Sequence, residues 1–352
     1  HVIEDIGANL EQPGDNNDDE DVGANPEIPE DNNDDEDNND EDIGANPEQP
    51  GDNNNEDNNK EGLMNPIEPR EATDGEIAIN SADELSKIGK DEDYPLNGKY
   101  ILTSNIDLSG INWEPIGNNS TNNSSSRFTG SFDGNGYSIT GLTIDKPSQN
   151  YVGLFGSTQR ATIENVALEG VNIKGGSKTG GLVGQAHNST KITNSYATGS
   201  VTGGSYTGGL VGYAGTPYVY VGISISNSYT TGSVTGTSNT GGLVGYAYES
   251  TEITNSYATG AVTGTGDYTG GLVGKAETSS TITDSYATGS VTSTGDATGG
   301  LVGYAGNITN GGITIKNSYA TGRVSGRAYT GGLAGNAYQS SVTNSYATGE
   351  VS

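Results

Sequence analysis

Residues 181–201 read GLVGQAHNSTKITNSYATGSV, and versions of this unit fill the second half of the chain. Three elements define the unit: Gly-Leu-Val-Gly, then Asn-Ser-Tyr-Ala-Thr-Gly, and then a valine. Self-similarity with a fixed period is the sequence signature of repeat architectures. The leucines of the first element recur 28 to 33 residues apart, at Leu154, Leu182, Leu210, Leu243, Leu272, Leu301 and Leu333.

This repeat predicts a stack of β-strands. Each unit holds three short β-prone segments joined by Gly-rich corners, and it lacks the period of an amphipathic helix. If every coil pairs in register with the next, at about 4.8 Å, identical residues stack into columns. We therefore predict an all-β fold, a parallel β-solenoid of about seven coils.

The columns predict what holds the coils together. Leucine, isoleucine and valine columns are expected to form a thin continuous core, and glycines to occupy corners with positive φ. The insertions at residues 216–222 and 307–312 are expected to bulge at corners. A side-chain amide ladder is expected from the column Asn194, Asn227, Asn255, Asn317 and Asn344, which Asp284 interrupts.

Composition divides the chain into three predicted parts. Residues 1–74 form an acidic, repetitive spacer, residues 75–150 an entry or cap region, and residues 151–352 the solenoid. In the entry region Ser81-Ala82-Asp83-Glu84 is a capping box that predicts a short helix over residues 82–88, ended by Gly89. Strand-like runs follow, with a tight turn expected at residues 133–136.

The net charge of the chain limits the kinds of partner that it can bind. The formal net charge is −30, and residues 1–60 hold 22 acids and one base, which leaves −9 for residues 61–352. Such a chain repels phosphate backbones and anionic lipid, so we expect neither nucleic-acid binding nor membrane insertion. The chain has no cysteine and no apolar run long enough to span a bilayer. Its start at His1 is expected of a processed chain or an excised fragment.

The acidic tracts are the candidate metal site. They offer only hard oxygen ligands, which suit Ca²⁺ better than a transition metal. They lack the EF-hand pattern, and a charged spacer without ordered ions is the alternative. No cofactor is expected to be required. The candidate calcium ligands are Asp15, Asp18, Asp19, Asp31, Asp34, Asp35, Asp37, Asp40, Asp52 and Asp57.

The repeats and the entry region resemble a known family. Gly181-Leu182-Val183-Gly184 and its copies are similar to the GLUG motif, and residues 98–156 are similar to the region that commonly precedes such repeats. GLUG proteins occur among bacterial and archaeal surface adhesins and in non-catalytic regions of IgA-peptidase-like proteins. The resemblance implies a secreted or cell-surface location and a scaffold role. The peptidase activity of some relatives is not implied, because the chain has no His-Glu-x-x-His and its only histidines are His1 and His187.

Catalysis is not expected. The acids of the solenoid are scattered, and no acid–base group breaks the regularity of the repeat at one place. A polysaccharide-acting β-helix enzyme is the less favoured alternative. Threonine columns such as the one through Thr259 offer a flat hydroxyl array. For the tyrosines outside the Asn-Ser-Tyr column, packing at the corners is the favoured interpretation and a sugar-stacking or protein-contact surface is the other. These are Tyr206, Tyr213, Tyr218, Tyr220, Tyr246, Tyr248, Tyr268, Tyr304, Tyr329 and Tyr338.

The predicted function is a structural or adhesive scaffold on the cell surface or in the extracellular medium. Its partners are expected to be further copies of the chain or cell-surface glycans, and a monomeric adhesin fragment that binds a glycan or a host protein is the alternative. The last coil would expose an unpaired strand edge, which favours head-to-tail association into extracellular filaments. The residues expected to take part are Val342, Tyr346 and Val351 at one end and Val2, Ile3 and Ile6 at the other.

Overall fold

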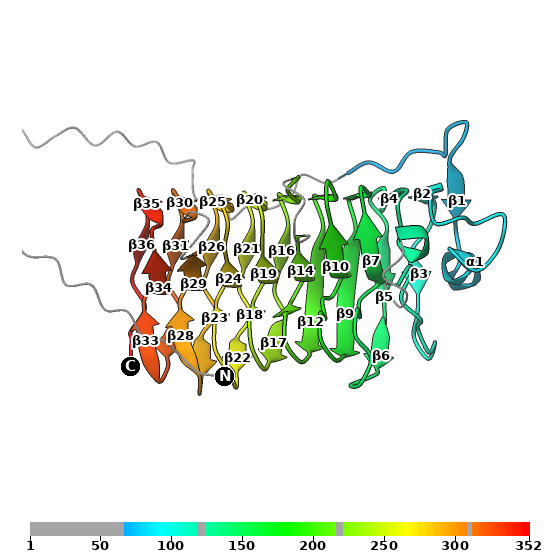
Figure 1. Cartoon of the computed structure of the whole chain (residues 1–352). Coiled ribbons are helices and arrows are strands. Elements are labelled where there is room, and N and C mark those ends of the chain that lie inside the picture. The colour runs from blue at the N-terminus through cyan, green and yellow to red at the C-terminus, as the bar shows by residue number, and fades with distance from the viewer. Residues whose placement is uncertain (1–66, 119–123, 216–220, 308–311) are drawn as a thin grey trace, which may run out of the picture. The chain divides into compact units, whose positions relative to one another are not determined.

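The structure is a computed structural model that describes residues 67–118, 124–215, 221–307 and 312–352. These residues form a parallel β-solenoid with almost no helix, which confirms the predicted fold class, and it has about eight turns where about seven coils were predicted (Figure 1). The strands of successive coils pair into four sheets that run along the stack. Every strand pair in these sheets is parallel, as the repeat requires.

The sheets are named here by their number of strands. The ten-stranded sheet contains β1 (Ile77–Ile79), β2 (Lys99–Leu102), β4 (Ser131–Asp133), β8 (Thr162–Glu164), β11 (Lys191–Thr193), β15 (Ser224–Ser226), β20 (Glu252–Thr254), β25 (Thr281–Thr283), β30 (Thr314–Lys316) and β35 (Ser341–Thr343). The seven-stranded sheet contains β7 (Phe155–Gln159), β10 (Val183–His187), β14 (Val211–Ala214), β19 (Val244–Ala247), β24 (Val273–Ala276), β29 (Val302–Gly306) and β34 (Ala334–Tyr338).

The other two sheets complete each coil. The fourteen-stranded sheet contains β3 (Ile106–Asp107), β5 (Ser138–Thr140), β6 (Thr143–Asp145), β9 (Ala167–Lys174), β12 (Tyr196–Thr202), β16 (Tyr229–Thr230), β17 (Ser233–Gly236), β21 (Tyr257–Ala258), β22 (Val262–Gly264), β26 (Tyr286–Ala287), β27 (Val291–Ser293), β31 (Tyr319–Ala320), β32 (Val324–Ser325) and β36 (Tyr346–Ala347). The five-stranded sheet contains β13 (Thr207–Gly208), β18 (Thr240–Gly241), β23 (Thr269–Gly270), β28 (Asp296–Gly299) and β33 (Ala328–Gly331).

The coil has more strands than the sequence predicts. We expected three per repeat, but a full coil such as the one from β14 to β18 has five. Two features account for the difference. The Thr-Gly dipeptide before Gly-Leu-Val-Gly pairs with its copies in a sheet of its own. In the coil of Leu210 and those that follow it, the segment after Asn-Ser splits into two short strands, whereas β12 in the preceding coil runs through as one.

The register is that of the predicted columns. Ile192 pairs with Ile225, Ile225 with Ile253, and Ile253 with Ile282, so that each isoleucine lies over the same residue of the next coil. The leucines from Leu182 to Leu301 have no exposed surface. At about 25 cal/mol for each Å² of apolar surface removed from water, such columns are the main stabilising contribution of a thin core.

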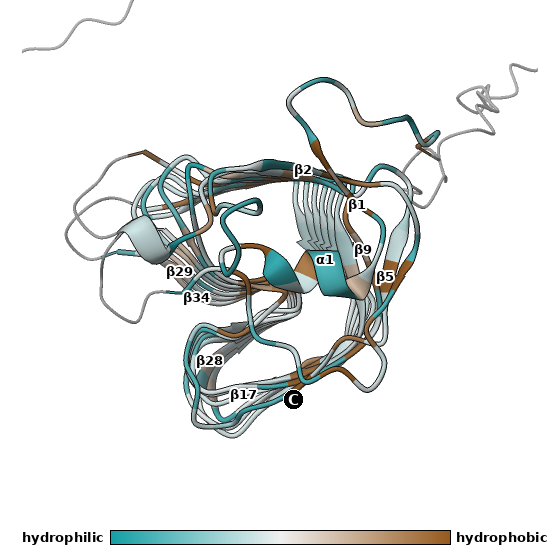
Figure 2. Cartoon of the chain, turned by 90° about the vertical axis from the view of Figure 1, so that its right-hand side faces the viewer, coloured by the Kyte–Doolittle hydropathy of each residue, from teal (hydrophilic) through white to brown (hydrophobic). Residues whose placement is uncertain are grey.

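The entry region starts the stack. Helix α1 (Ala82–Lys87) begins after Ser81, whose side chain accepts a hydrogen bond from the Glu84 N–H, and its Leu85 is buried. It ends one residue before the predicted end. Figure 2 looks down the stacked coils and shows α1 in front of their interior, and Figure 1 places it at the N-terminal end of the stack. A cap would occupy this position, and its effect on association at this end stays a prediction.

Asparagine adopts the positive-φ corner conformation that we expected of glycine, and several glycines are needed for another reason. The predicted positive-φ corners are taken by the asparagine column, for example Asn255 at φ 47° and Asn317 at φ 50°. Gly260, Gly289 and Gly322 of Asn-Ser-Tyr-Ala-Thr-Gly are not among the positive-φ residues. A Cβ added at Gly289 would instead overlap the carbonyl oxygen of Gly260 in the preceding coil. Glycine is therefore needed here because consecutive backbones approach closely.

The predicted turn, the two insertions and the absence of a membrane span can be compared with the structure. The turn at residues 133–136 is confirmed, with Asn135 and Gly136 at positive φ. Both insertions fall at the corner between the seven-stranded and ten-stranded sheets, because they join β14 to β15 and β29 to β30; residues 216–220 and 308–311 within them lie outside the described residues. Over the described ranges, no helix combines the length and apolarity that a bilayer span requires.

Candidate functional site

The residues predicted for self-association separate into two groups. Val342, Tyr346 and Val351 lie in the last coil and are 42%, 56% and 45% exposed. Val2, Ile3 and Ile6 lie outside the described residues. Association between the two ends of the chain therefore stays a prediction.

The candidate calcium ligands, from Asp15 to Asp57, also lie outside the described residues. Within residues 67–352, apart from the three undescribed loops, no cluster of three His, Asp or Glu side chains is arranged to hold a metal ion. His187 is 4% exposed in β10, and burial, aided by the charges of Arg127 and Lys178, lowers its pKa to about 3. An imidazole in this environment stays neutral at physiological pH.

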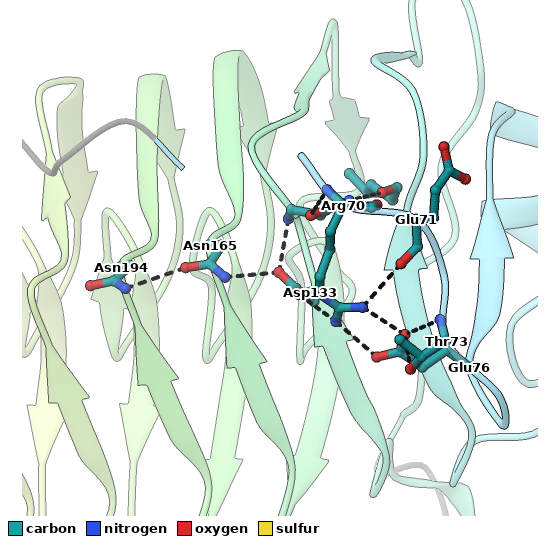
Figure 3. Close-up of polar contacts among 9 residues, drawn as sticks. Arg70, Glu71, Thr73, Glu76, Asp133, Asn165 and Asn194 are labelled. Carbon is teal, nitrogen blue, oxygen red and sulfur yellow. Dashed lines mark hydrogen bonds and ion pairs between the residues drawn. The ribbon is translucent and has the colours of Figure 1, made fainter. Parts of the chain in front are cut away.

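A polar cluster joins the segment before β1 to the solenoid (Figure 3). The N–H of Arg70 donates to Asn135 Oδ1 at 2.9 Å, and Asn135 Nδ2 donates to the carbonyl oxygen of Arg70 at 2.8 Å. The Arg70 guanidinium pairs with both oxygens of Glu76 at 2.8 Å and with Asp133 Oδ2 at 3.2 Å. Residues 67–76, hereafter the strap, are thus fixed to the turn after β4, although the sequence assigned most of them to a solvated spacer.

The contacts of the strap shift the pKa values of its charged residues. Hydrogen bonds from the Arg70 guanidinium, and from the N–H and hydroxyl of Thr73, lower the pKa of Glu76 to about 2. The same pairing raises the pKa of Arg70. The pair is partly solvated, with the Glu76 side chain 18% exposed, so its role is to position the strap more than to stabilise the whole fold.

The amide ladder continues from this cluster. Asn165 Nδ2 donates to Asp133 Oδ1 at 2.8 Å, and Asn194 Nδ2 donates to Asn165 Oδ1 at 3.3 Å (Figure 3). At the other end of the stack, Asn317 Nδ2 donates to Asp284 Oδ1 at 2.9 Å. Asn344 extends this second stretch with a 3.3 Å bond to Asn317. Within the predicted column the ladder is confirmed between Asn344 and Asn317, whereas Asp284 accepts a bond from Asn317 where an interruption was predicted, and Asn165 and Asp133 extend the ladder beyond the predicted residues.

The tyrosines of Asn-Ser-Tyr form one continuous stack on the fourteen-stranded sheet. Neighbouring ring centroids lie 4.7 to 5.3 Å apart, and neighbouring planes are within 7° of parallel. Within the stack each ring face is covered by the next ring, so that mainly ring edges and hydroxyl groups face solvent. This arrangement stabilises the coils against one another and leaves little ring surface for a ligand. The stacked residues are Tyr196, Tyr229, Tyr257, Tyr286, Tyr319 and Tyr346.

A second aromatic group lies where the five-stranded and seven-stranded sheets meet. Figure 2 shows β28 and β34 next to each other at this corner of the coil. We call this group the aromatic strip, and it consists of two columns. The first column is the residue before Thr-Gly-Gly-Leu, or before Val-Gly-Leu in the first repeat. The second column is the variable residue x of Val-Gly-x-Ala and its variants. The first column is Tyr151, Lys178, Tyr206, Asn239, Tyr268, Ala297 and Tyr329, and the second is Ser157, Gln185, Tyr213, Tyr246, Lys275, Tyr304 and Asn336.

The two columns of the aromatic strip contact each other. Tyr206 packs against Tyr213 with ring centroids 5.5 Å apart, and Tyr268 against Tyr304 at 5.2 Å. Lys275 Nζ lies 4.9 Å from the Tyr268 ring centroid and 3.0 Å from Glu277 Oε1. Cation–π contacts of this kind hold an ammonium group between aromatic rings.

Lys178, in the first column and three coils earlier, makes similar contacts. Its Nζ lies 4.9 Å from the Tyr151 ring centroid and 5.0 Å from that of Tyr213, and it donates to Gln185 Oε1 at 2.9 Å. Burial lowers the pKa of Lys178. Burial also raises the pKa of Tyr213 and Tyr246, the latter with help from a hydrogen bond to Glu277. The strip is therefore a partly dehydrated surface with aromatic rings and amide and ammonium donors.

The sequence predicted part of the aromatic strip. It singled out the tyrosines but not the lysines between them, and it favoured corner packing, which the ring contacts confirm for Tyr213 and Tyr246. Tyr218 and Tyr220 lie outside the described residues, whereas Tyr329 is 65% exposed. The signal for the lysines was present in the sequence, because Lys178 stands before an unchanged Thr-Gly-Gly-Leu and Lys275 inside an otherwise unchanged Val-Gly-x-Ala, at positions that change from repeat to repeat.

The fold and its surfaces define a parallel β-solenoid repeat protein. Four segments of the solenoid match the family model described as "The GLUG motif", at residues 175–202, 236–263, 265–292 and 326–352. The resemblance found in the sequence is thereby confirmed.

Related proteins share this region in part. The chain is 38% identical over 114 residues to Halomucin of Haloquadratum walsbyi and 38% identical over 84 residues to a Gly-rich membrane protein of Evansella cellulosilytica. It is 34% identical over 108 residues to an Immunoglobulin A1 protease of Streptococcus sanguinis. The matches cover 30%, 24% and 30% of this chain but only 1%, 9% and 5% of those relatives.

Solved structures share the fold. A protein named as an immunoglobulin A1 protease from Bacteroides ovatus superposes with a TM-score of 0.59 at 20% identity, over 77% of this chain and 84% of the other. An IgA1 Protease structure superposes with a TM-score of 0.54 at 23% identity, over 76% of this chain and 21% of the other. At this level of identity the likeness concerns the solenoid fold.

Proposed function

We propose that this chain is a secreted, surface-displayed structural scaffold: a stiff rod that separates or presents other parts of a cell-surface assembly. The observation that carries the proposal is the unbroken ten-stranded sheet, in which parallel pairing continues from β1 to β35. In such a solenoid each coil is stabilised by its neighbours, so stiffness extends along the stack. The names of the related Halomucin and Gly-rich membrane protein support a surface location.

We propose no catalytic role for the solenoid. Its acids are distributed over several coils, and burial, together with the charges of Arg127 and Lys178, keeps the imidazole of His187 neutral. The immunoglobulin A1 proteases similar to this chain share with it a limited region, or the fold alone.

The scaffold proposal is tested by the dimensions of the protein. Deleting residues 244–301 removes two coils and joins Leu243 to Val302 in register. We expect small-angle scattering to give a rod-like particle for both proteins, with the deletion variant shorter by about 9.6 Å. A globular or flexible particle, or an unchanged length, would contradict the proposal.

Head-to-tail association is the finer part of the proposal. Unpaired strand edges template pairing with further chains, and the coil that carries Val342, Tyr346 and Val351 exposes such an edge in the chain as given. Sedimentation of the chain over a wide concentration range, and electron microscopy of the same samples, should show filaments. Strictly monomeric particles at high concentration would contradict association and leave the rod intact.

A further inference from the structure

Both columns of the aromatic strip differ from one repeat to the next. On the fourteen-stranded sheet, the outward tyrosine of Asn-Ser-Tyr is the same in six coils. In the strip, the residue before Thr-Gly-Gly-Leu changes between lysine, tyrosine, asparagine and alanine, and the variable residue of Val-Gly-x-Ala changes between glutamine, tyrosine, lysine and asparagine. Residues that only stack on their copies gain from being identical. Where a column departs from this identity, its side chains are free to make contacts other than stacking on their own copies.

The backbone adds a second observation. Tyr151, Lys178, Tyr206, Tyr268 and Tyr329 have φ between 52° and 66°. This left-handed region is unfavourable for bulky side chains, and residues held in it are found preferentially at functional sites. The asparagine column at the other corner meets the same backbone requirement with a residue that tolerates it. Asn239 and Ala297 of the same column also lie in this region, at φ 52° and 58°, so the corner accepts a smaller residue, yet tyrosine occupies four of the seven positions in spite of its conformational cost.

The spacing of the rings along the stack indicates the repeat length of a ligand that would fit them. Tyr151, Tyr206, Tyr268 and Tyr329 occupy every second coil, and Lys178, Asn239 and Ala297 lie between them. With about 4.8 Å for each coil, the tyrosines recur every 9.6 Å or so along the stack. In an extended chain of β-1,4-linked pyranoses, successive sugars are turned over, so the same sugar face returns at every second residue over a comparable length.

The chemistry of the strip fits a neutral sugar chain. Aromatic rings pack against the apolar C–H face of a pyranose, and amide and hydroxyl groups orient its hydroxyls. A polyanion is disfavoured, because the ammonium group of Lys275 is already paired with Glu277, whose carboxylate also accepts a hydrogen bond from Tyr246 in the strip. We propose that the aromatic strip binds a neutral, extended β-1,4-linked polysaccharide laid along the solenoid axis, with alternate sugars against alternate tyrosines.

The test uses the full chain and defined oligosaccharides. Calorimetry with the β-1,4-linked hexasaccharides of glucose and of N-acetylglucosamine should show binding of at least one, which also identifies the sugar. Tyr206→Ala/Tyr268→Ala should weaken this binding by roughly tenfold or more, whereas Tyr206→Phe/Tyr268→Phe, which keeps both rings, should retain it. The single variant Tyr329→Ala changes a ring that is 65% exposed and should weaken binding without lowering the melting temperature.

The matched control removes two tyrosines from the same two coils but from the fourteen-stranded sheet. Tyr229→Ala/Tyr286→Ala should keep full affinity at a temperature where the variant is folded. The proposal is overturned if neither hexasaccharide binds, if a galacturonate oligosaccharide or a proline-rich peptide binds in preference, or if the control loses affinity as the strip variants do. Rod dimensions are measured independently, so failure of the binding proposal is distinguishable from failure of the scaffold proposal.

Discussion

Individual residues in this solenoid are constrained by their copies one coil away. A leucine of Gly-Leu-Val-Gly lies between two other leucines, and a glycine of Ala-Thr-Gly lies against the backbone of another glycine. Because the core is thin, a change at one position has few neighbours that can move to compensate. Single substitutions should therefore have large effects in the middle of the stack.

Leu243→Ala should lower the free energy of unfolding by about 2–5 kcal/mol, because it leaves a cavity in a column without exposed surface. Urea denaturation followed by circular dichroism measures the change. Thr263→Ala, at an exposed position, is the control and should change stability by no more than about 0.5 kcal/mol. Equal stability of Leu243→Ala and the unaltered chain would mean that the leucine column is not a core.

Gly289→Ala should cost at least about 2 kcal/mol, since the added methyl group would overlap the carbonyl oxygen of Gly260 and force the coils apart. The neighbouring Ser290→Ala, on the exposed side, should be close to neutral. Thermal unfolding of both variants distinguishes close approach from the turn role that glycine usually has. If Gly289→Ala melts like Ser290→Ala, the coils do not approach as closely as described.

At the scale of elements, the strap and the tyrosine stack show two ways in which distant segments are joined. The strap depends on Arg70, which reaches residues more than 60 positions away in sequence. The stack depends on rings contributed by six consecutive coils. The first is electrostatic and should respond to pH, and the second should respond to the loss of a ring.

The strap should loosen in acid. The pKa of Glu76 is lowered from 4.5 to about 2, so its pairing stabilises the strap above pH 4.5 and is lost as the pH falls through about 2. A chemical-shift titration of the Thr73 N–H, which donates to Glu76, should have its midpoint near the lower value. Arg70→Gln should move the midpoint toward 4.5. A midpoint near 4.5 in the unaltered chain would show that the pairing does not persist in solution.

Tyr257→Ala should destabilise the solenoid by about 1–3 kcal/mol, because Tyr257 stacks on Tyr229 at 4.7 Å and on Tyr286 at 4.8 Å and each pair contributes about 0.5–1.5 kcal/mol. Tyr346→Ala, which removes one pair, should cost less. Calorimetric melting of both variants measures the difference. The opposite order of effects would contradict a continuous stack.

At the scale of the whole molecule, charge is divided unevenly. Residues 1–60 carry −21 of the formal net charge of −30, whereas the solenoid is close to balanced. Mutual repulsion favours extension of so acidic a segment, and divalent cations relieve such repulsion. The two parts should therefore respond differently to ions.

Millimolar Ca²⁺ should compact residues 1–60 and leave the solenoid unchanged. Scattering and calorimetry of the full chain, compared with a variant in which the ten candidate aspartates from Asp15 to Asp57 are replaced by asparagine, isolate the effect. We expect heat and a smaller radius of gyration only in the unaltered chain. Identical dimensions and no heat with Ca²⁺ would leave the segment a simple spacer.

The sequence alone determined the fold class, the number of GLUG coils and the register. This was possible because parallel in-register stacking places each residue on its own copy, so the period read from the leucines is the path of the chain around one coil. The isoleucine and leucine columns and part of the amide ladder could be predicted for the same reason. The calcium and self-association residues were predicted from charge and edge arguments and stay predictions.

Only the tertiary structure decided what occurs between columns. The sequence could not show that a coil has five strands, that asparagine rather than glycine takes the left-handed corner, or that Arg70 reaches Asp133. Nor could it show that Lys275 lies between Tyr246, Tyr268 and Tyr304. These contacts join residues from different sheets and different coils, and they depend on the angle at which two sheets meet. The repeat fixes which residues stack along the axis, whereas the shape of the coil fixes which columns touch.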